Sequence, residues 1–158
     1  PGDPAALTLF KLADRGLAFK IAGLNQKLSF VYIDDLVDAI VRMAEDGCAA
    51  HKLYYVVHDQ QITTRMLWDA LGRAVGRKLF MIRVPKRVLG GIVELLGAAS
   101  RFVDFDNRLD RKKFNQMTEP AFLCSSARLK QELGWTPAWE LDPALAATSQ
   151  AYRTAGLL

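Results

Sequence analysis

The clearest pattern of apolar and polar positions lies in residues 28–45. Alternating apolar residues run into Asp34 and Asp35, and a helical pattern of apolar residues leaves from them. We expect residues 28–33 to be a strand, and the two aspartates to cap the helix that follows, whose N-terminus favours side-chain acceptors and negative charge. This helix should bury a broad stripe. The stripe consists of Leu36, Val37, Ile40, Val41 and Ala44.

Turn and cap signals predict the other elements. Asp3 and Pro4 should start a helix that stops at Gly16, and residues 19–22 should form a short strand that makes a β-hairpin with 28–33. The apolar run 53–57 is typical of a buried strand, and 79–84 is predicted as another. Further helices are expected from Thr63 or Thr64 to Gly76, over 86–103, over 108–117, from Ser125-Ser126 to Leu133, and from Asp142-Pro143 to about Thr154.

Composition indicates one globular unit. The chain has 158 residues, of which 51% are hydrophobic and 24% charged, and this is enough to bury a sizeable core. Since no run of about 18 uncharged apolar residues occurs, we expect no membrane span. The first residues have neither an initiator Met nor a signal-peptide pattern, so we expect a piece of a longer protein. Two cysteines, Cys48 and Cys124, suit a reducing, cytoplasmic compartment.

The net charge of +4 raises the possibility of a nucleic-acid partner. However, the basic residues are dispersed along the chain. The densest run, residues 108–113, includes an aspartate and is explained by a solvated helix face. We therefore predict no nucleic-acid partner.

Cys48 and His51 have a spacing that is found in metal sites. One Cys and one His cannot complete a tetrahedral site, and His58 with Cys124 offers no recognised second pair. We predict no metal centre.

Several segments, in order, resemble motifs of one family. Residues 28–45 are similar to the strand–Asp-Asp–helix signature of the extended short-chain dehydrogenases/reductases, also called the NAD-dependent epimerase/dehydratase family. The other matching segments are Pro1-Gly2-Asp3 ("YGPGD" loop), 53–63 ("YNVG…vT"), 125–137 ("SKAxxELGWxP") and 147–158 ("T..WYR..GWL"). The resemblance covers nearly the whole chain.

This resemblance implies a helix-rich α/β fold, the C-terminal portion of an extended Rossmann-type enzyme, with a short β-hairpin and a few strands. Residues 1–158 would be a single substrate-binding domain or fragment, and its strands would attach to a parallel sheet built by an N-terminal dinucleotide-binding half upstream. NAD or NADP would be bound mainly by that half, because no glycine-rich G-x-x-G-x-x-G turn is present here.

The family's catalytic Tyr and Lys lie four residues apart, where the lysine lowers the tyrosine pKa. No tyrosine here is followed by lysine at that spacing; the four are Tyr32, Tyr54, Tyr55 and Tyr152. The sequence thus contains no catalytic residue of this type. We expect the parent protein to be an NAD(P)-dependent oxidoreductase or epimerase, and this fragment alone to be inactive.

The resemblance also implies site residues. Pro1 and Gly2 would lie beside the nicotinamide, and residues 86–103 would form a lid or wall over the substrate. The hairpin would lie along a small-molecule substrate. Its contributing residues would be Lys20, Ala22, Lys27, Leu28, Phe30 and Tyr32.

The substrate class depends on Leu28. Nucleotide-sugar members carry at this position an arginine that contacts the diphosphate, and a leucine cannot make that contact. Leu28, together with Val84-Pro85-x-x-Val88, favours the branch resembling hydroxysteroid dehydrogenases and dihydroflavonol reductases. A nucleoside-diphosphate-sugar epimerase and a non-catalytic structural or regulatory relative stay open as alternatives, and so does a homodimer.

Overall fold

A computed structural model describes residues 4–46, 52–91, 115 and 118–158. Helices provide most of the regular structure in this part of the chain, and the strands are short, so the helix-rich α/β class is confirmed. The helices are α1 (Pro4–Asp14), α2 (Ile33–Glu45), α3 (Thr64–Val75), α6 (Ala127–Leu133) and α7 (Leu141–Thr154). The strands are β1 (Leu17–Ile21), β2 (Lys27–Leu28), β3 (Ile62–Thr63), β4 (Phe80–Val84) and β5 (Ala121–Phe122).

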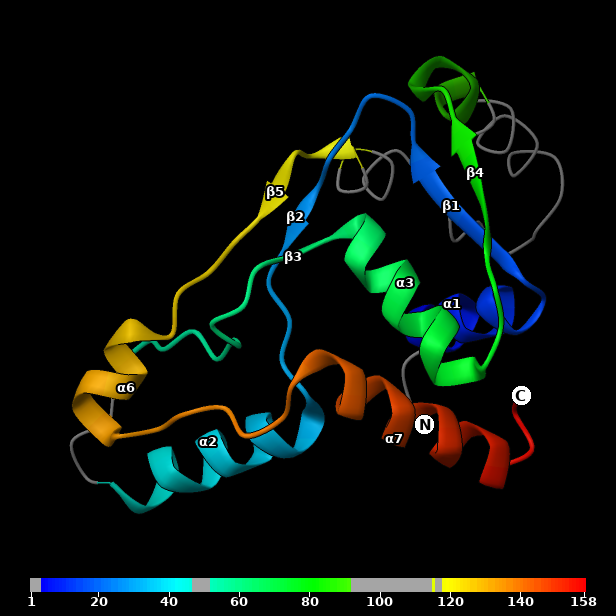
Figure 1. The fold of residues 1–158 in the computed structure, drawn as a ribbon. Coiled ribbons are helices and arrows are strands. Elements are labelled where there is room, and N and C mark those ends of the chain that lie inside the picture. Colours follow the sequence, from blue (N-terminus) through cyan, green and yellow to red (C-terminus); the bar gives the residue numbers. More distant parts are fainter. Residues whose placement is uncertain (1–3, 47–51, 92–114, 116–117) are drawn as a thin grey trace, which may run out of the picture.

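The strands form two small sheets. β1 pairs with β4 in parallel, with Leu17 opposite Phe80 and Ile21 opposite Val84. β2 lies between β3, to which it is antiparallel, and β5, to which it is parallel. Figure 1 shows β1 and β4 side by side at one end of the molecule, and α2 with α6 at the other.

The predicted hairpin between residues 19–22 and 28–33 is wrong. β1 and β2 belong to different sheets, and the partner of β1 comes from much later in the chain. Gly23, with φ of +77°, turns the backbone away after β1, and Leu24 N–H donates to the carbonyl of Ile21. Of the strand predicted over 28–33, only Leu28 belongs to β2; residues 29–32 have no regular secondary structure, and Ile33 begins α2. Alternation predicts a strand but cannot say which strand pairs with it.

The predicted buried strand at 53–57 is also wrong in the described part of the chain. The segment makes no strand pairing there, and Leu53 and Tyr55 are 71% and 55% exposed. Tyr54 and Val56, which alternate with them, pack against the cluster around Trp135. The segment therefore has one apolar side packed and the other open. The strand expected at 79–84 is confirmed as β4. In the described structure it pairs with β1 of this chain.

The two aspartates do not cap α2. The residue at the cap is Tyr32, and no side-chain hydrogen bond caps the helix. Asp35 is instead 5% exposed, and its carboxylate accepts from the backbone N–H of Ala138 at 2.9 Å and of Trp139 at 3.1 Å. Asp34 is exposed. The Asp35 carboxylate, which we expected at the helix cap, thus binds the distant segment at Ala138 and Trp139 instead.

The stripe predicted to be buried on α2 is largely open. Val37, Ile40 and Val41 are about half exposed, and the side of the helix that packs carries Asp35 and Ala39 at a spacing of one turn. The helix is amphipathic as predicted, but in the described structure its apolar stripe has no partner.

Most of the remaining helix ends agree with the sequence signals, whereas the predicted caps at Ser126 and Asp142 do not form. Gly16 follows α1 with φ of +75°; Thr63 caps α3 by accepting from Met66 N–H at 3.2 Å, and Gly76 ends that helix with φ of +73°. α6 ends at Gly134, and α7 begins at Leu141 after Glu140 rather than at an Asp142 cap. Of the helix predicted over 86–103, residues 86–91 are described and helical. The helix predicted over 108–117 lies outside the described residues except for Asn115.

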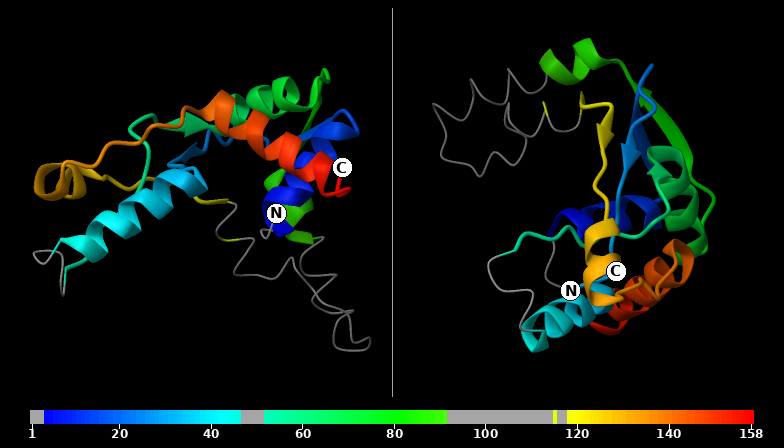
Figure 2. Two further views of the ribbon diagram at one scale, coloured as in Figure 1. Left: turned by 90° about the horizontal axis from the view of Figure 1, so that it is seen from below. Right: turned by 90° about the vertical axis from the view of Figure 1, so that its left-hand side faces the viewer.

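The largest core cluster joins α1, β1, α3 and α7. Phe10 of α1 meets the ring of Tyr152 edge-on at 5.2 Å, while Trp68 and Leu71 of α3 fill the space between these helices. A second cluster around Trp135 holds α2 and α6 together. Figure 2 shows the resulting separation, with α2 and α6 at the end away from α1 and β1. No helix within the described ranges is both long and apolar enough to cross a bilayer.

Candidate functional site

An apolar cavity of about 650 Å³ lies between α1, the end of β1 and the start of α3. α1 faces it with Ala5, Leu9 and Leu12, which are spaced at helical intervals, while Phe10 and Ala13 on the other side of the helix enter the core. The remaining apolar walls are Phe19, Ile21, Leu24, Leu28, Leu67, Trp68, Val84 and Leu89. A cavity of this size and lining suits a small molecule with an apolar body.

The polar groups of the cavity wall are mostly engaged within the protein. Trp68 Nε1 donates to the carbonyl of Phe19 at 2.7 Å, Gln26 Nε2 donates to the carbonyl of Glu119 at 2.9 Å, and the Thr8 hydroxyl donates to the carbonyl of Pro4 at 2.7 Å. Lys20 is the one charged residue among the described residues of the wall. A ligand in this cavity would therefore meet apolar surface and one cation.

The structure brings two of the predicted substrate residues together. Lys20 of β1 and Leu28 of β2 both line the apolar cavity, although their strands belong to different sheets. They meet there because the turn at Gly23 carries the chain from the end of β1 to β2.

The other predicted residues lie elsewhere. Ala22 is exposed and donates its N–H to the carbonyl of Val84, and Lys27 is exposed in β2 between Thr63 and Ala121. Two aromatic residues complete the set. Phe30 stacks on His58 with ring centroids 4.8 Å apart, and Tyr32 packs on Trp139 at 4.5 Å. Pro1 and Gly2 lie outside the described residues.

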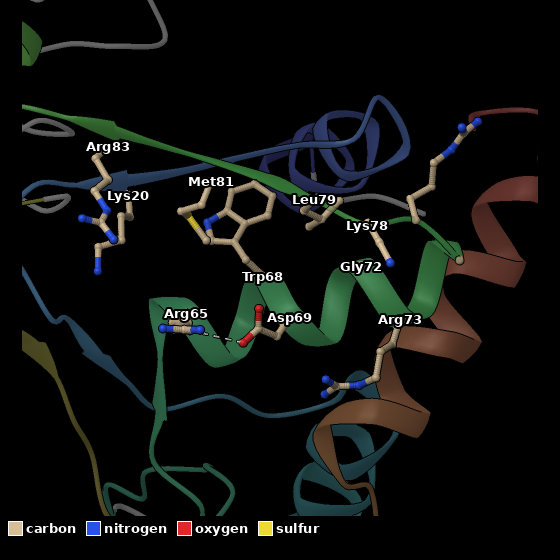
Figure 3. A pocket seen from close by; sticks show the side chains of 12 residues that line it. Lys20, Arg65, Trp68, Asp69, Gly72, Arg73, Lys78, Leu79, Met81 and Arg83 are labelled. Atoms are coloured by element: carbon tan, nitrogen blue, oxygen red, sulfur yellow. Dashed lines mark ion pairs between the residues drawn. The ribbon is translucent and has the colours of Figure 1, made fainter.

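A groove of about 780 Å³ adjoins the cavity and is strongly basic (Figure 3). Its described lining contains one acidic residue, Asp69, and six basic ones: Lys20, Arg65, Arg73, Arg77, Lys78 and Arg83. The sequence did not predict this groove, because these residues are scattered over three elements and their connections. One sequence signal could have indicated part of it. Met81 and Arg83 are two residues apart in β4, so they project from the same face of the strand, and both line the groove.

Glu132 of α6 is the centre of a second polar cluster. Its carboxylate accepts from Arg128 Nε and Lys52 Nζ, both at 2.8 Å, and from the Tyr54 hydroxyl at 2.6 Å. These bonds lower the pKa of Glu132 to about 2, and the bond from Arg128 has the largest effect. The bond to Glu132 also raises the pKa of Tyr54, so its phenol stays protonated. The cluster fastens the segment around Tyr54 to α6 and offers no acid or base for chemistry near neutrality.

No protein-family model matches the sequence, and no curated protein does. Solved structures match along nearly the whole chain. The protein gox2253 aligns with a TM-score of 0.68 and 18% identity, over 99% of this chain and 45% of its own. UDP-glucose 4-epimerase from Thermotoga maritima, solved with UDP-glucose, aligns with a TM-score of 0.66 and 15% identity, over 98% of this chain and 41% of its own. DesIV, the dTDP-glucose 4,6-dehydratase of Streptomyces venezuelae, solved with NAD bound, aligns with a TM-score of 0.63 and 20% identity, over 96% of this chain and 38% of its own.

The chain has the fold of the C-terminal part of NAD-dependent epimerase/dehydratase enzymes. It spans less than half the length of each of these solved structures. The family resemblance drawn from the sequence motifs is thus confirmed at the level of the fold. The predicted role of individual residues stays a prediction.

The described residues of this epimerase/dehydratase fold do not by themselves fit a dinucleotide. A pyrophosphate site needs a glycine-rich turn between a strand and a helix N-terminus. Among the described glycines, Gly16 and Gly76 follow helices, and Gly23 follows β1 but leads into β2. Within the same ranges, no group of three His, Cys, Asp or Glu side chains could hold a metal ion. Cys48 and His51 lie outside the described residues.

Proposed function

We propose that this chain is the substrate-binding portion of an NAD(P)-dependent enzyme that acts on a hydroxyl or carbonyl carbon of an apolar small molecule. The reaction would be a net oxidoreduction, or a hydride transfer within an epimerisation or dehydration. One observation carries the proposal: the apolar cavity of about 650 Å³ has Leu28 in its wall. By resemblance, this is the position of the diphosphate-binding arginine of nucleotide-sugar enzymes. A leucine there favours the branch of the family that resembles hydroxysteroid dehydrogenases and dihydroflavonol reductases.

The proposal requires a dinucleotide-binding portion from outside this chain. Two features support a docking place for it. The apolar stripe of α2 at Val37, Ile40 and Val41 is about half exposed, and Leu53 and Tyr55 in the segment 53–57 are exposed as well. An exposed apolar patch favours a protein partner. We infer that a parallel sheet of the dinucleotide-binding portion covers both.

A nucleotide-sugar substrate is the second candidate. It is favoured by the fold likeness to a UDP-glucose epimerase and a dTDP-glucose dehydratase. Against it, the cavity wall offers a diphosphate the cation Lys20 and no other charged group among its described residues. A non-catalytic structural or regulatory relative is a third reading, and the presence of a Tyr-x-x-x-Lys pair in the dinucleotide-binding portion would decide against it.

Ligand titration of the intact protein tests the proposal. Trp68 lines the cavity and reports binding by its fluorescence. We expect progesterone or dihydroquercetin to bind more tightly than UDP-glucose, and NADH or NADPH to bind as well. Leu28→Arg should weaken binding of the apolar ligands by about tenfold or more, since a charge would enter an apolar wall. Lys27→Arg, on the neighbouring exposed residue, is the matched control and should change little.

Two outcomes would contradict the proposal. Tighter binding of UDP-glucose than of either apolar ligand would favour the nucleotide-sugar reading. If the intact protein bound no dinucleotide, the assignment to an NAD(P)-dependent enzyme would collapse. A cytoplasmic location and a homodimer stay predictions that neither titration tests.

A further inference from the structure

Lys20 and Arg83 lie directly opposite each other on the neighbouring strands β1 and β4. In parallel strands, residues in register project to the same face of the sheet, and both side chains line the basic groove (Figure 3). Two like charges opposite each other on adjacent strands repel. This arrangement therefore destabilises the empty site, and an anion between the two cations would relieve the repulsion.

No carboxylate within the described ranges neutralises this pair. Asp69 is the one acidic residue of the groove's described lining, and its carboxylate pairs with Arg65 at 3.7 Å. Lys20 and Arg83 take part in no ion pair among the described residues. Lys20 is half-buried. The positive charge at this end of the groove is thus available to a ligand.

The charged pair adjoins the apolar cavity. Lys20 and Trp68 line both the cavity and the groove, so that the two spaces share these two residues. A molecule in the cavity would be next to Lys20 at one end. The combination of an apolar chamber and a pair of cations at its edge matches a ligand with an apolar body and one acidic group.

We propose that the cavity takes an amphipathic anion, with its apolar body against Leu28 and Leu67 and its carboxylate or phosphate between Lys20 and Arg83. The guanidinium of Arg83 can donate two parallel hydrogen bonds to such a group, and the ammonium of Lys20 adds a point charge. This inference rests on the proposed function, since it takes the cavity to be the substrate site, and it adds the chemical class of the substrate.

A polyanion such as RNA fits the groove less well. Arg73 is already paired with Asp142 at 2.7 Å, and Arg65 with Asp69. Lys78 lies at the other end of α3 from Lys20 and Arg83 (Figure 3). A nucleic-acid backbone needs a row of unpaired cations along its path. The cations without an ion pair among the described residues are instead divided between the two ends of α3. Lys20 and Arg83 lie at the end next to the cavity, and Arg77 and Lys78 follow the other end.

Three probes with one apolar chain separate the effects: decanoate, decyl phosphate and decanol, titrated into the intact protein at low salt. Decanoate or decyl phosphate should bind about tenfold or more tightly than decanol, and the tighter of the two identifies the preferred acidic group. The double variant Lys20→Met and Arg83→Met should abolish this preference, so that the two anions bind no more tightly than decanol. Lys20→Arg should retain it. Lys78→Met removes one charge from the far end of the groove and should also retain it.

The outcomes distinguish this inference from the proposed function. If decanol binds and the two anions bind no more tightly, the inference is overturned and the apolar site stands. It is also overturned if the preference survives in the double variant, or if a single-stranded oligonucleotide binds more tightly than decanoate with a steep salt dependence. If none of the three decyl probes binds, the apolar site itself fails, and the inference fails with it.

Discussion

The carboxylate of Asp35 accepts a hydrogen bond from the backbone N–H of Trp139, although 104 residues separate the two along the chain. The same carboxylate accepts from the N–H of Ala138, and the ring of Trp139 packs on Tyr32, just before α2. One buried side chain thus ties the first turn of α2 to the segment between α6 and α7. An aspartate that a sequence analysis assigns to a local helix cap serves a long-range contact instead.

Replacing Asp35 with alanine should destabilise the fold. The change removes two charge-assisted hydrogen bonds and leaves two backbone donors without a partner, a loss of about 2–3 kcal/mol in the free energy of unfolding. Urea denaturation followed by circular dichroism measures it. Asp34→Ala is the matched control, because Asp34 lies in the same helical turn but is exposed. It should cost less than about 1 kcal/mol. Equal losses in the two variants would show that the contact to Trp139 contributes nothing.

Replacing Trp68 with phenylalanine should cost about 1–3 kcal/mol. The substitution keeps an aromatic ring in the core but removes the Nε1 donor, which leaves the carbonyl of Phe19 unpaired beside the cavity. Thermal unfolding monitored by circular dichroism checks the loss. Trp139→Phe is the comparison, since its ring packs on Tyr32 at the other end of the molecule and its effect should be smaller. A neutral Trp68→Phe variant would contradict the role of this hydrogen bond.

Gly72→Ala should destabilise the chain even though alanine favours helices. A Cβ atom at Gly72 would lie 2.9 Å from the carbonyl oxygen of Arg77 and 3.1 Å from Leu79 Cγ. Such overpacking costs about 1–3 kcal/mol, against a gain in helix propensity of about 1 kcal/mol. Gly91→Ala, also in a helix but with no described residue close to its Cβ, should be neutral or slightly stabilising. The two melting temperatures, compared with that of the wild type, test the close approach of α3 to the segment that joins it to β4.

Acid should weaken the attachment of Tyr54 to α6. The pKa of Glu132 is about 2 in the folded chain, below its ordinary value of 4.5. A carboxylate with a lowered pKa contributes stability that is present above pH 4.5 and is lost as the pH falls from about 4.5 towards 2. Glu132→Gln should remove this part of the pH dependence. Urea titrations across that pH range measure it.

The control for Glu132 is Glu119→Gln, whose exposed side chain makes no ion pair among the described residues. It should leave the acid dependence of unfolding unchanged. If Glu132→Gln and the wild type lost stability in parallel between pH 4.5 and 2, the ion cluster would carry no acid-sensitive stability.

The chain studied by itself should self-associate and have no NAD(P)-dependent turnover. Val37, Ile40 and Val41 form an exposed apolar stripe on α2, which favours contacts between copies. Ile40→Glu should shift the protein towards monomer in size-exclusion chromatography, with a stability change of less than about 0.5 kcal/mol. Ala39→Glu, on the packed side of the same helix, should unfold it. Turnover with NADH or NADPH by this chain would overturn the assignment of its catalytic groups to another portion.

The sequence by itself determined where the helices lie and which larger fold they belong to. Thr63, Gly16, Gly76 and Gly134 mark helix ends because capping and left-handed backbone conformations depend on the local residue alone. The ordered motifs, centred on residues 28–45, identified the fold. Their order and spacing along the chain can be recognised even though identity to the solved structures is low.

Only the tertiary structure decided which strands pair and what the polar groups do. The pairing of β1 with β4 joins residues far apart in the sequence, and no local pattern encodes the choice of partner. For the same reason Lys20 and Arg83 could not be recognised as neighbours, nor Asp35 as the acceptor for Trp139. Local residues set backbone conformation, whereas long-range contacts are selected by how the whole chain buries its apolar surface. The position of a charge therefore becomes known only after folding.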